Sequence, residues 1–376
     1  MKVPFYKHQL GASEINAFSS AIKSEILTTG NEVFQFEDEF SRFLGTNHCI
    51  AVQSCTAGLQ LCLEAYEFKP NSEVITTPLT YIATALSILQ AKLKPVFCDV
   101  DPETGNIDIT KIENYITPKT VAIMPVHLYG QMVDMVTLTK IAKENNLVCI
   151  EDAAHCVEGK KENYGPGSLS EAACFSFYAT KNITCGEGGC ITTNSTELAN
   201  KLRMLRSHGV SKIAFDRHKD GYSHWELKTL GWKYNLDNLH ASILRPQLPL
   251  IKEKLQSREN AAIYYEELLK EINEVNLFVN EKNIVHARHL FPIRVPCNHR
   301  DNLIKYLQKF NIGIVVNYRS LNKYNLLLNE SLYDEKSFIN ASKIGDEVLS
   351  LPMYPQISKE EIEFVVSKIS NYFKIN

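Results

Sequence analysis

Residues 174–189 read Cys174-Phe-Ser-Phe-Tyr-Ala-Thr-Lys181-Asn-Ile-Thr-Cys-Gly186-Glu-Gly-Gly189, and this stretch is the most specific segment of the chain. An apolar run typical of a strand is followed by one lysine among small and polar residues, and then by a glycine-rich turn that lets the backbone pass close to its neighbours. A lysine amine can form a Schiff base with an aldehyde when desolvation or a nearby cation lowers its pKa. Because a lysine at a strand end is more often a surface residue in a salt bridge, this segment alone leaves both interpretations open.

Short apolar runs alternate with helical patterns on both sides of this segment. Alternation of this kind is typical of βαβ units and a mostly parallel sheet, and runs as apolar as VAIMPV indicate strands that helices cover on both faces. Upstream, Phe36, Phe40, Phe43 and Leu44 predict a helix with one buried face that ends at Gly45. The candidate strands are EVITTP (73–78), KPVFCDV (94–100), TVAIMPVH (120–127), LVCIEDAA (147–154), ACFSFYA (173–179) and GCITTN (189–194).

The pattern changes after residue 237, where a long charged amphipathic stretch over 251–272 predicts a connecting helix. Beyond it we expect a strand over 289–295, a helix over 301–310, a strand over 312–318 and a final helix over 358–373. The chain therefore divides into a large α/β domain over residues 1–245 and a smaller α+β domain over 246–376.

Composition excludes several classes of protein. The 40 basic and 43 acidic residues give a formal net charge of −3, without a basic stripe for nucleic acid. No run approaches the roughly 20 apolar residues that cross a bilayer, and the first residues lack the apolar core of a signal peptide. The ten cysteines lie mostly in apolar runs, as buried thiols of a reduced cytoplasm do, and the absence of C-x-x-C and H-E-x-x-H predicts no metal site.

Two other strand ends carry candidate chemistry, because ligands of open α/β sheets bind beyond the carboxyl ends of the strands. Residues 53–58 lead from a strand into a helix with small side chains and free N–H groups, which suit either a phosphate cradle or an ordinary helix cap. The run LVCI delivers Glu151 and Asp152, and His155 follows. A carboxylate here needs a positive partner, and a protonated pyridine nitrogen is one possibility, although a capping aspartate and a packed histidine also fit.

The segments 125–131, 151–155 and 176–189 resemble the signature segments of the DegT/DnrJ/EryC1/StrS family of pyridoxal-phosphate-dependent sugar aminotransferases, which have the aspartate aminotransferase fold. Further similarity lies at 4–15, 26–30, 78–81, 95–102, 206–209 and 349–352, so it covers nearly the whole chain. The resemblance implies an α/β protein of fold type I, in which helices cover a mostly parallel seven-stranded sheet and a smaller α+β domain follows.

The resemblance also implies an activity. We expect a cytoplasmic aminotransferase that moves an amino group from L-glutamate to a keto-sugar, most readily a nucleotide-linked 3- or 4-keto sugar used for surface-polysaccharide or glycan precursors. A keto-cyclitol or small keto-alcohol as acceptor, or a non-catalytic regulatory protein that binds pyridoxal phosphate, remain as alternatives. One branch of the family replaces the lysine with histidine and performs dehydration, and Lys181 argues against that branch.

Roles at the cofactor follow position by position from the resemblance. Lys181 binds pyridoxal 5'-phosphate covalently and moves the proton between substrate and cofactor, and Asp152 pairs with the pyridinium nitrogen. His155 lies beside the phenolic oxygen. Tyr81 matches the aromatic residue that stacks on the ring; the alternative is a tyrosine buried in the core.

The phosphate of the cofactor has a second set of candidate residues. Cys55, Thr56 and Ser176 match the phosphate-binding positions of the family. Lys233 and Asn235 match the stretch from which the neighbouring subunit reaches the phosphate, and either could make that contact. The expected working unit is a homodimer with a shared active site.

Candidate substrate residues are fewer. Thr28 lies in the similar segment 26–30, and Arg319 and His289 could donate to a diphosphate, although a surface salt bridge and a packed histidine are as well supported. Residues 316–319 depart from the V-H-Y pattern of many relatives. The sequence leaves open the sugar, the nucleotide, the position and stereochemistry of amination, and any assembly beyond a dimer.

Overall fold

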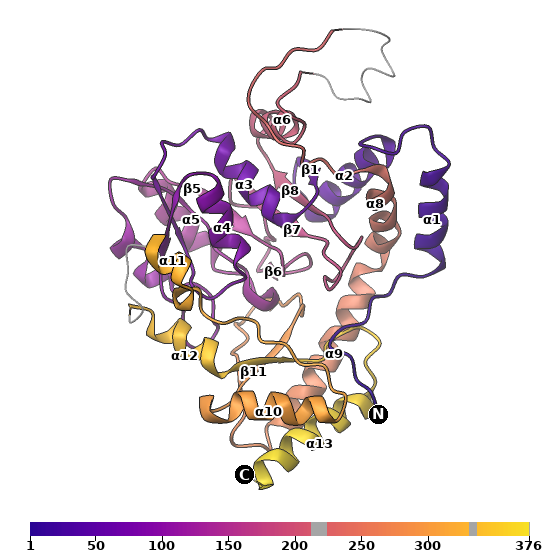
Figure 1. The fold of residues 1–376 in the computed structure, drawn as a ribbon, viewed down its shortest axis with the longest axis vertical. Coiled ribbons are helices and arrows are strands. Elements are labelled where there is room, and N and C mark those ends of the chain that lie inside the picture. The colour runs from indigo at the N-terminus through magenta and orange to yellow at the C-terminus, as the bar shows by residue number, and fades with distance from the viewer. Residues whose placement is uncertain (212–223, 331–336, 376) are drawn as a thin grey trace.

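The computed structural model describes residues 1–211, 224–330 and 337–375 (Figure 1). Within them, the larger part is built on a seven-stranded sheet in the order β1-β8-β7-β5-β4-β2-β3. Neighbours from β7 to β3 are parallel, whereas β8 is antiparallel to both β7 and β1. The predicted mostly parallel, seven-stranded sheet is confirmed. The strands are β1 (His48–Val52), β2 (Glu73–Thr76), β3 (Lys94–Phe97), β4 (Thr120–Ile123), β5 (Val148–Asp152), β7 (Ala172–Ser176) and β8 (Gly189–Thr193).

Helices cover both faces of the sheet. On β7, Ala172 and Cys174 pack in one hydrophobic cluster with α3 and α6, whereas Ala173 and Phe175 pack in another with α2 and α8. Successive side chains of a strand point to opposite faces, so a strand buried on both faces needs an unbroken apolar run. The helices of this part are α1 (Ala12–Ile22), α2 (Asn31–Leu44), α3 (Cys55–Ala65), α4 (Ala83–Gln90), η1 (Ile109–Tyr115), η2 (Leu128–Gly130), α5 (Met135–Glu144), α6 (Thr196–Leu205), α8 (Asn238–Leu244) and η3 (Arg245–Leu250).

The predicted amphipathic helix is α2. Phe36 and Phe40 are fully buried, and both rings meet the ring of Phe177 edge-on at 5.4 and 5.5 Å between centroids. Each buried aromatic side chain stabilises the fold by about 1.5–3 kcal/mol. The helix ends at Gly45, whose φ of 75° is the left-handed conformation that glycine adopts without strain, as the sequence predicts.

The smaller part contains a three-stranded antiparallel sheet packed against helices. The long helix α9 (Ile251–Leu269) leads into it from the larger part, and α10 and α13 lie at the bottom of Figure 1. Tyr265 of α9, Ile293 and Leu307 are among the fully buried residues of its core. None of the described helices is long and apolar enough to span a membrane. The remaining elements are β6 (Lys160–Lys161), β9 (Asn276–Leu277), β10 (Ile284–Val285), β11 (Phe291–Arg294), α10 (Cys297–Lys309), η4 (Leu321–Lys323), α11 (Asn325–Glu330), α12 (Ile339–Glu347), β12 (Val348–Leu351) and α13 (Lys359–Ile375).

The strand predicted over 312–318 is wrong. Only isolated bridges form there, from Ile312 to Val3 and from Val315 to Ser350. The backbone of Phe5 runs so close that a Cβ on Gly313 would lie 2.3 Å from its nitrogen. The N-terminal segment therefore occupies part of the edge along which residues 312–318 would have to pair. The sheet of the smaller part ends with β12, which pairs with β11.

Asp99 joins the two parts of the molecule. It is buried after β3, where its Oδ1 accepts the backbone N–H of Ala341 at 3.0 Å and its Oδ2 accepts that of Asn340 at 3.1 Å. These N–H groups belong to the first turn of α12, which has no intrahelical acceptor for them. Asp99 thus caps a helix of the smaller part from the larger part, beside an apolar cluster that contains Phe97 and Phe338.

We predict that Asp99→Ala lowers the free energy of unfolding by about 1–3 kcal/mol, because the two N–H groups at the start of α12 lose a charged acceptor. Urea unfolding measures the change. Asp301→Ala is the matched control, since the Asp301 side chain is 73% exposed in a surface ion pair with Arg300. An equal loss in both variants would contradict the capping role.

Candidate active site

The carboxyl ends of β5 and β7 bring the chemically important segments together. The two strands are parallel neighbours in which Asp152 pairs with Cys174, so the turn that carries Lys181 leaves the sheet beside Asp152. The helix α3 begins at the same edge, because the Sγ of Cys55 lies 3.9 Å from the Oδ1 of Asp152. Three segments that are far apart in the sequence therefore meet at one edge of the sheet.

Lys181 is partly buried and lines a pocket with Asn182, Arg258 and His289. Burial of its ammonium group lowers the pKa of Lys181 to about 8, against the opposing influence of Cys55 and Asp152. A fraction of the amine is therefore neutral near pH 7. The neutral amine is the form that attacks a carbonyl carbon.

Asp152 is only 5% exposed and is held by neutral donors. Its Oδ2 accepts the hydroxyl of Thr84 at 2.7 Å, and its Oδ1 accepts the N–H of Ala154 at 3.1 Å. Two such bonds fix the carboxylate, and none of the described basic residues forms an ion pair with it. A buried carboxylate of this kind fits the protonated ring nitrogen of pyridoxal phosphate.

His155 is buried and its tautomer follows from its partners. The Nδ1 accepts the backbone N–H of Tyr129 at 3.2 Å, so the ring proton sits on Nε2, which lies 3.0 Å from the hydroxyl of Tyr318. Burial, followed by the charge of Lys181, holds the pKa of His155 well below its usual range. His155 is thus a neutral hydrogen-bonding group at the site.

Glu151 has a structural role. It points to the opposite face from Asp152, as neighbours on a strand do. There its carboxylate accepts from His127 at 2.5 Å, from the N–H of Gly167 at 2.8 Å and from the hydroxyl of Ser170. The second carboxylate delivered by this strand is therefore satisfied away from the site.

The start of α3 lies at the position where the phosphate cradle is predicted. Ser54 caps the helix by accepting the N–H of Ala57 at 3.1 Å, while the N–H groups of Cys55 and Thr56 precede any intrahelical acceptor. A Cβ on Gly189 would lie 2.5 Å from the nitrogen of Cys55, so β8 can approach the helix only with glycine there. An N-terminus with unused N–H groups and small neighbours fits a phosphate group.

Ser176 borders this cradle, because it pairs with Gly189 across the sheet. It is buried, and its Oγ accepts the N–H of Tyr178 at 3.3 Å. The hydroxyl proton of Ser176 is not used in that bond. Ser176 is thus next to Gly189, which in turn lies against the start of α3 with Cys55 and Thr56.

The segment with Lys233 and Asn235 lies next to β1, where Val52 forms a bridge with Asn235. The amide of Asn235 donates to the hydroxyl of Thr29 at 2.7 Å and lies 3.5 Å from that of Thr28. Lys233 is exposed. Within the subunit, the amide of Asn235 is therefore bonded mainly to Thr29, whereas the side chain of Lys233 is exposed to solvent.

Tyr81 and Arg319 occupy exposed positions. Tyr81 is 56% exposed and its ring centroid lies 5.8 Å from that of Tyr318, so it is not a residue of the core. The guanidinium of Arg319 lies over the ring of Tyr324, 5.3 Å from its centroid. Tyr81 thus borders the Tyr318–His155 pair. Arg319 packs on Tyr324, a few residues further along the chain.

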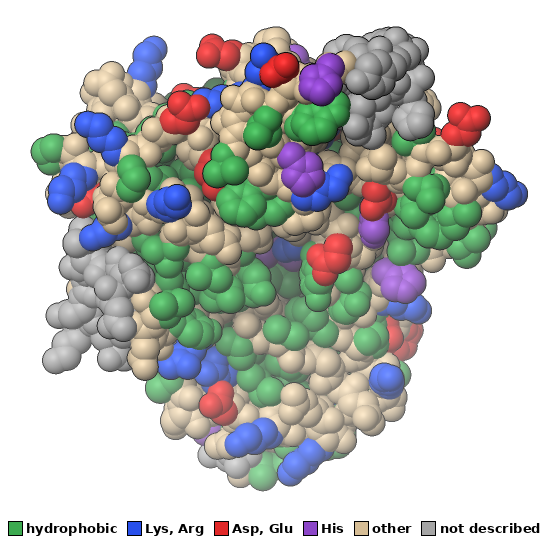
Figure 2. All heavy atoms as spheres, turned by 45° about the horizontal axis from the view of Figure 1, so that its top comes forward, with side chains coloured by type: hydrophobic (Ala, Val, Ile, Leu, Met, Phe, Trp, Pro, Cys, Tyr) green, Lys and Arg blue, Asp and Glu red, His purple; other side chains and the backbone are tan. Residues whose placement is uncertain are grey.

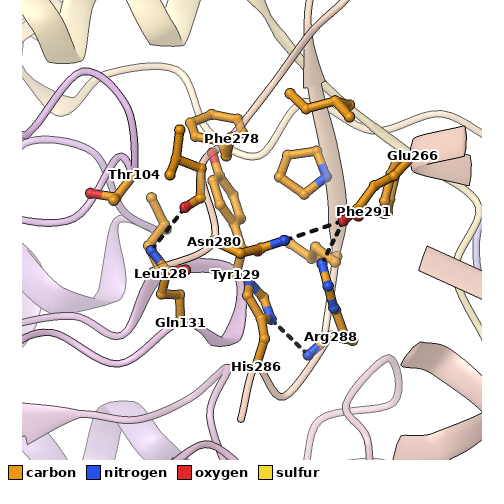
Figure 3. A pocket seen from close by; sticks show the side chains of 14 residues that line it. Thr104, Leu128, Tyr129, Gln131, Glu266, Phe278, Asn280, His286, Arg288 and Phe291 are labelled. Atoms are coloured by element: carbon orange, nitrogen blue, oxygen red, sulfur yellow. Dashed lines mark hydrogen bonds and ion pairs between the residues drawn. The ribbon is translucent and has the colours of Figure 1, made fainter. Parts of the chain in front are cut away.

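Several residues at the site were not predicted from the sequence. Thr84 and Tyr318 contact Asp152 and His155, and Glu158 and Arg258 form a buried ion pair at 2.5 Å behind Asn182. Of the residues in this group, only Asn182 had a signal in the local sequence, namely its position directly after Lys181. A further pocket, shown in Figure 3, lies between Tyr129, Phe278 and Arg288, and none of the predicted site residues lines it.

Comparisons with known proteins agree with this geometry. Residues 8–370 match the profile of the DegT/DnrJ/EryC1/StrS aminotransferase family. The spore coat polysaccharide biosynthesis protein SpsC of Bacillus subtilis is 36% identical over 379 residues, covering 99% of this chain and 97% of its own. A pleiotropic regulatory protein of Geobacillus stearothermophilus is 36% identical over 370 residues, covering 97% of this chain and 96% of its own.

Solved structures of the same fold include PseC and DesV. PseC of Helicobacter pylori, an aminotransferase involved in the biosynthesis of pseudoaminic acid, superposes with a TM-score of 0.93 at 26% identity over the whole of both chains. DesV of S. venezuelae superposes with a TM-score of 0.92 at 30% identity, covering 99% of this chain and 98% of its own.

The cofactor is supported by a further neighbour. The putative sugar aminotransferase Spr1654 of Streptococcus pneumoniae is 25% identical and has been solved in a PLP-form and a PMP-form, with TM-scores of 0.92 and 0.93. Each form covers at least 99% of both chains. The predictions of the fold, of an aminotransferase and of pyridoxal phosphate as its cofactor are confirmed. The chain belongs to the DegT/DnrJ/EryC1/StrS aminotransferase family.

Proposed function

We propose that this aminotransferase moves an amino group from L-glutamate to a keto-sugar, most readily a nucleotide-linked 3- or 4-keto sugar, in the cytoplasmic synthesis of surface-polysaccharide or glycan precursors. The observation that carries the proposal is the placement of a desolvated Lys181 and a buried Asp152 at the ends of adjacent strands. Membership of the family supports the sugar as substrate class. The names of SpsC and PseC, which concern a spore coat polysaccharide and pseudoaminic acid, favour a glycan precursor.

Lys181 and Asp152 are the proposed catalytic residues. Pyridoxal phosphate, when bound, supplies an electron sink for the carbanion formed at the substrate carbon. Lys181 would hold the cofactor through its Nζ and, once released, accept and return the proton at that carbon, for which a pKa of about 8 suits it near neutral pH. Asp152 would keep the ring nitrogen protonated, because its carboxylate is held in place by Thr84 and Ala154.

The remaining cofactor contacts follow from the same arrangement. His155 would donate its single N–H, on Nε2, to the phenolic oxygen in place of the hydroxyl of Tyr318, and Tyr81 would cover the ring. Cys55 and Thr56 would donate N–H groups to the phosphate, and Ser176 would donate its hydroxyl.

We further propose a homodimer in which Lys233 or Asn235 of one subunit reaches the phosphate of the other. The exposure of Lys233 favours the lysine, since the amide of Asn235 already serves Thr29. Exposed apolar side chains just before this segment support a partner surface, because a monomer seldom leaves such a group in water. They are Trp225, Leu227, Leu230 and Trp232.

The substrate would enter between the two parts of the molecule. Figure 2 shows hydrophobic side chains gathered around a hollow between the larger upper part and the smaller lower part. Thr28 and Arg319 remain proposed substrate contacts, and the exposed guanidinium of Arg319 suits a diphosphate.

A second candidate is a regulatory protein that binds pyridoxal phosphate without turnover. The 36% identity to the pleiotropic regulatory protein of Geobacillus stearothermophilus supports this second candidate. An aminotransferase consumes L-glutamate, whereas a sensor only binds its ligand. The two proposals therefore differ in one simple measurement.

We expect the purified protein to show the yellow absorbance of lysine-bound cofactor, and L-glutamate to bleach it while 2-oxoglutarate accumulates. Lys181→Ala should abolish the covalent attachment and the bleaching, because the variant lacks the Nζ that is proposed to hold the cofactor. Lys201→Ala, in a surface pair with Glu67, is the matched control and should behave as wild type. Bleaching retained in Lys181→Ala would refute the assignment, and binding without bleaching in wild type would favour the regulatory protein.

Asp152→Asn should retain the cofactor but lower the rate of glutamate-dependent bleaching about 100-fold or more, because the neutral amide cannot keep the ring nitrogen charged. Stopped-flow absorbance measures the rate, and the near-isosteric change keeps the bond from Thr84 possible. Asp301→Asn, at an exposed position, should leave the rate unchanged. A rate within a few-fold of wild type in Asp152→Asn would contradict the proposed role.

The acceptor is tested by offering keto-sugar nucleotides, a keto-cyclitol and a small keto-alcohol with L-glutamate, and by detecting amination by mass spectrometry. We expect a nucleotide-linked keto-sugar to be aminated fastest, with Arg319→Ala raising the KM for it more than it lowers kcat. Faster amination of the keto-cyclitol or keto-alcohol would move the substrate assignment to that class. It would leave the roles of Lys181 and Asp152 untouched.

A further inference from the structure

A chain of buried polar contacts ends on the amine of Lys181. The Nζ of Lys181 lies 3.4 Å from the Nε2 of His289, and the Nδ1 of His289 lies 3.1 Å from the Oδ1 of Asn182. Asn182 donates to the Oε2 of Glu158 at 2.7 Å, and the other oxygen of Glu158 is 2.5 Å from Arg258. The sequence separation between Glu158 and His289 shows that the fold, and not local geometry, builds this chain.

The direction of the hydrogen bonds follows from the acceptors at its far end. The Nδ2 of Asn182 faces the carboxylate of Glu158 and, at 3.0 Å, the carbonyl of Ala287, and neither can donate. The amide oxygen of Asn182 must therefore face His289. An amide oxygen only accepts, so the ring proton of His289 is on Nδ1 and the lone pair is on Nε2, facing Lys181.

Burial keeps this imidazole neutral. His289 is 6% exposed, and its pKa is held well below the usual range by desolvation and then by the charge of Lys181. The Glu158–Arg258 pair behind it is also buried, so the anchor of the chain does not exchange with solvent partners. The Nε2 of His289 is therefore a fixed acceptor next to a lysine.

We propose that His289 is a positioning residue whose Nε2 accepts an N–H of Lys181, and that Asn182, held by Glu158, sets the tautomer that makes this possible. The inference rests on the proposed role of Lys181 as the reacting amine. A neutral amine has two N–H bonds and one lone pair, so engaging one N–H restricts the direction in which the lone pair can attack. Because both ring nitrogens of His289 are engaged within the protein, this role replaces the diphosphate contact expected from the sequence.

The same segment supplies a matched control. His286 lies three residues earlier, where its Nδ1 accepts the N–H of Arg288 at 3.0 Å, and Figure 3 shows both side chains in the other pocket. His286 and His289 are thus histidines of one segment that line different pockets. Replacing either one removes a comparable volume.

The test measures the protonation of Lys181 in the full-length chain freed of cofactor. Limiting acylation of Lys181, quantified by peptide mass spectrometry against pH, follows the neutral amine and should have its midpoint near pH 8 in wild type. The groups that face this amine are Asp152, Cys55, His155 and His289, and only the last is changed in the test.

We expect His289→Leu and Asn182→Leu each to lower the midpoint by about one pH unit, because the ammonium form loses its acceptor. His289→Gln, whose amide oxygen can accept, should restore a midpoint near that of wild type, and His286→Leu should not shift it. An unchanged midpoint in His289→Leu, or an equal shift in His286→Leu, would overturn the proposal while leaving the proposed role of Lys181 intact.

A second measurement uses only the wild-type chain, so it tests the proposal even if a variant fails to fold. The ¹⁵N resonances of selectively labelled histidines in the wild-type chain should show His289 protonated on Nδ1 and unprotonated on Nε2. A proton on Nε2 would overturn the proposal. Failure of the proposed function would be seen separately, as cofactor attachment that survives Lys181→Ala.

Discussion

The parallel pairing of β5 with β7 is the constraint on which the rest of the site depends. Because Asp152 is in register with Cys174, a buried carboxylate and the turn that carries Lys181 must leave the same edge of the sheet. The antiparallel return of β8 then brings Gly189 against the start of α3. The relative positions of amine, carboxylate and cradle are thus set by backbone pairing within the sheet.

Burial gives these groups their chemistry. Desolvation lowers the pKa of Lys181 to about 8 and keeps His155 and His289 neutral, so the amine of Lys181 lies beside two neutral imidazoles. Unpaired buried charges are costly, and the fold offsets that cost with the Glu158–Arg258 pair and with neutral donors on Asp152. The same contacts that satisfy buried polar atoms therefore also orient the reacting ones.

The sequence predicted those features that a local pattern encodes. Unbroken apolar runs located the strands, and in the structure Asp152 ends β5 and Lys181 follows β7. The interval 312–318 failed because Phe5, three hundred residues away, crowds Gly313, and no periodicity records such a contact. Thr84, Glu158 and Tyr318 were missed for the same reason, since their importance arises only from tertiary distances.

The central claim is that Lys181 is the amine to which the cofactor is attached. Borohydride reduction of the cofactor-loaded enzyme, followed by digestion and mass spectrometry, tests it most directly, because reduction makes the attachment permanent. The account predicts one modified residue, Lys181. Modification of another lysine, for instance Lys254, which is buried in the wall of the same pocket, would contradict it.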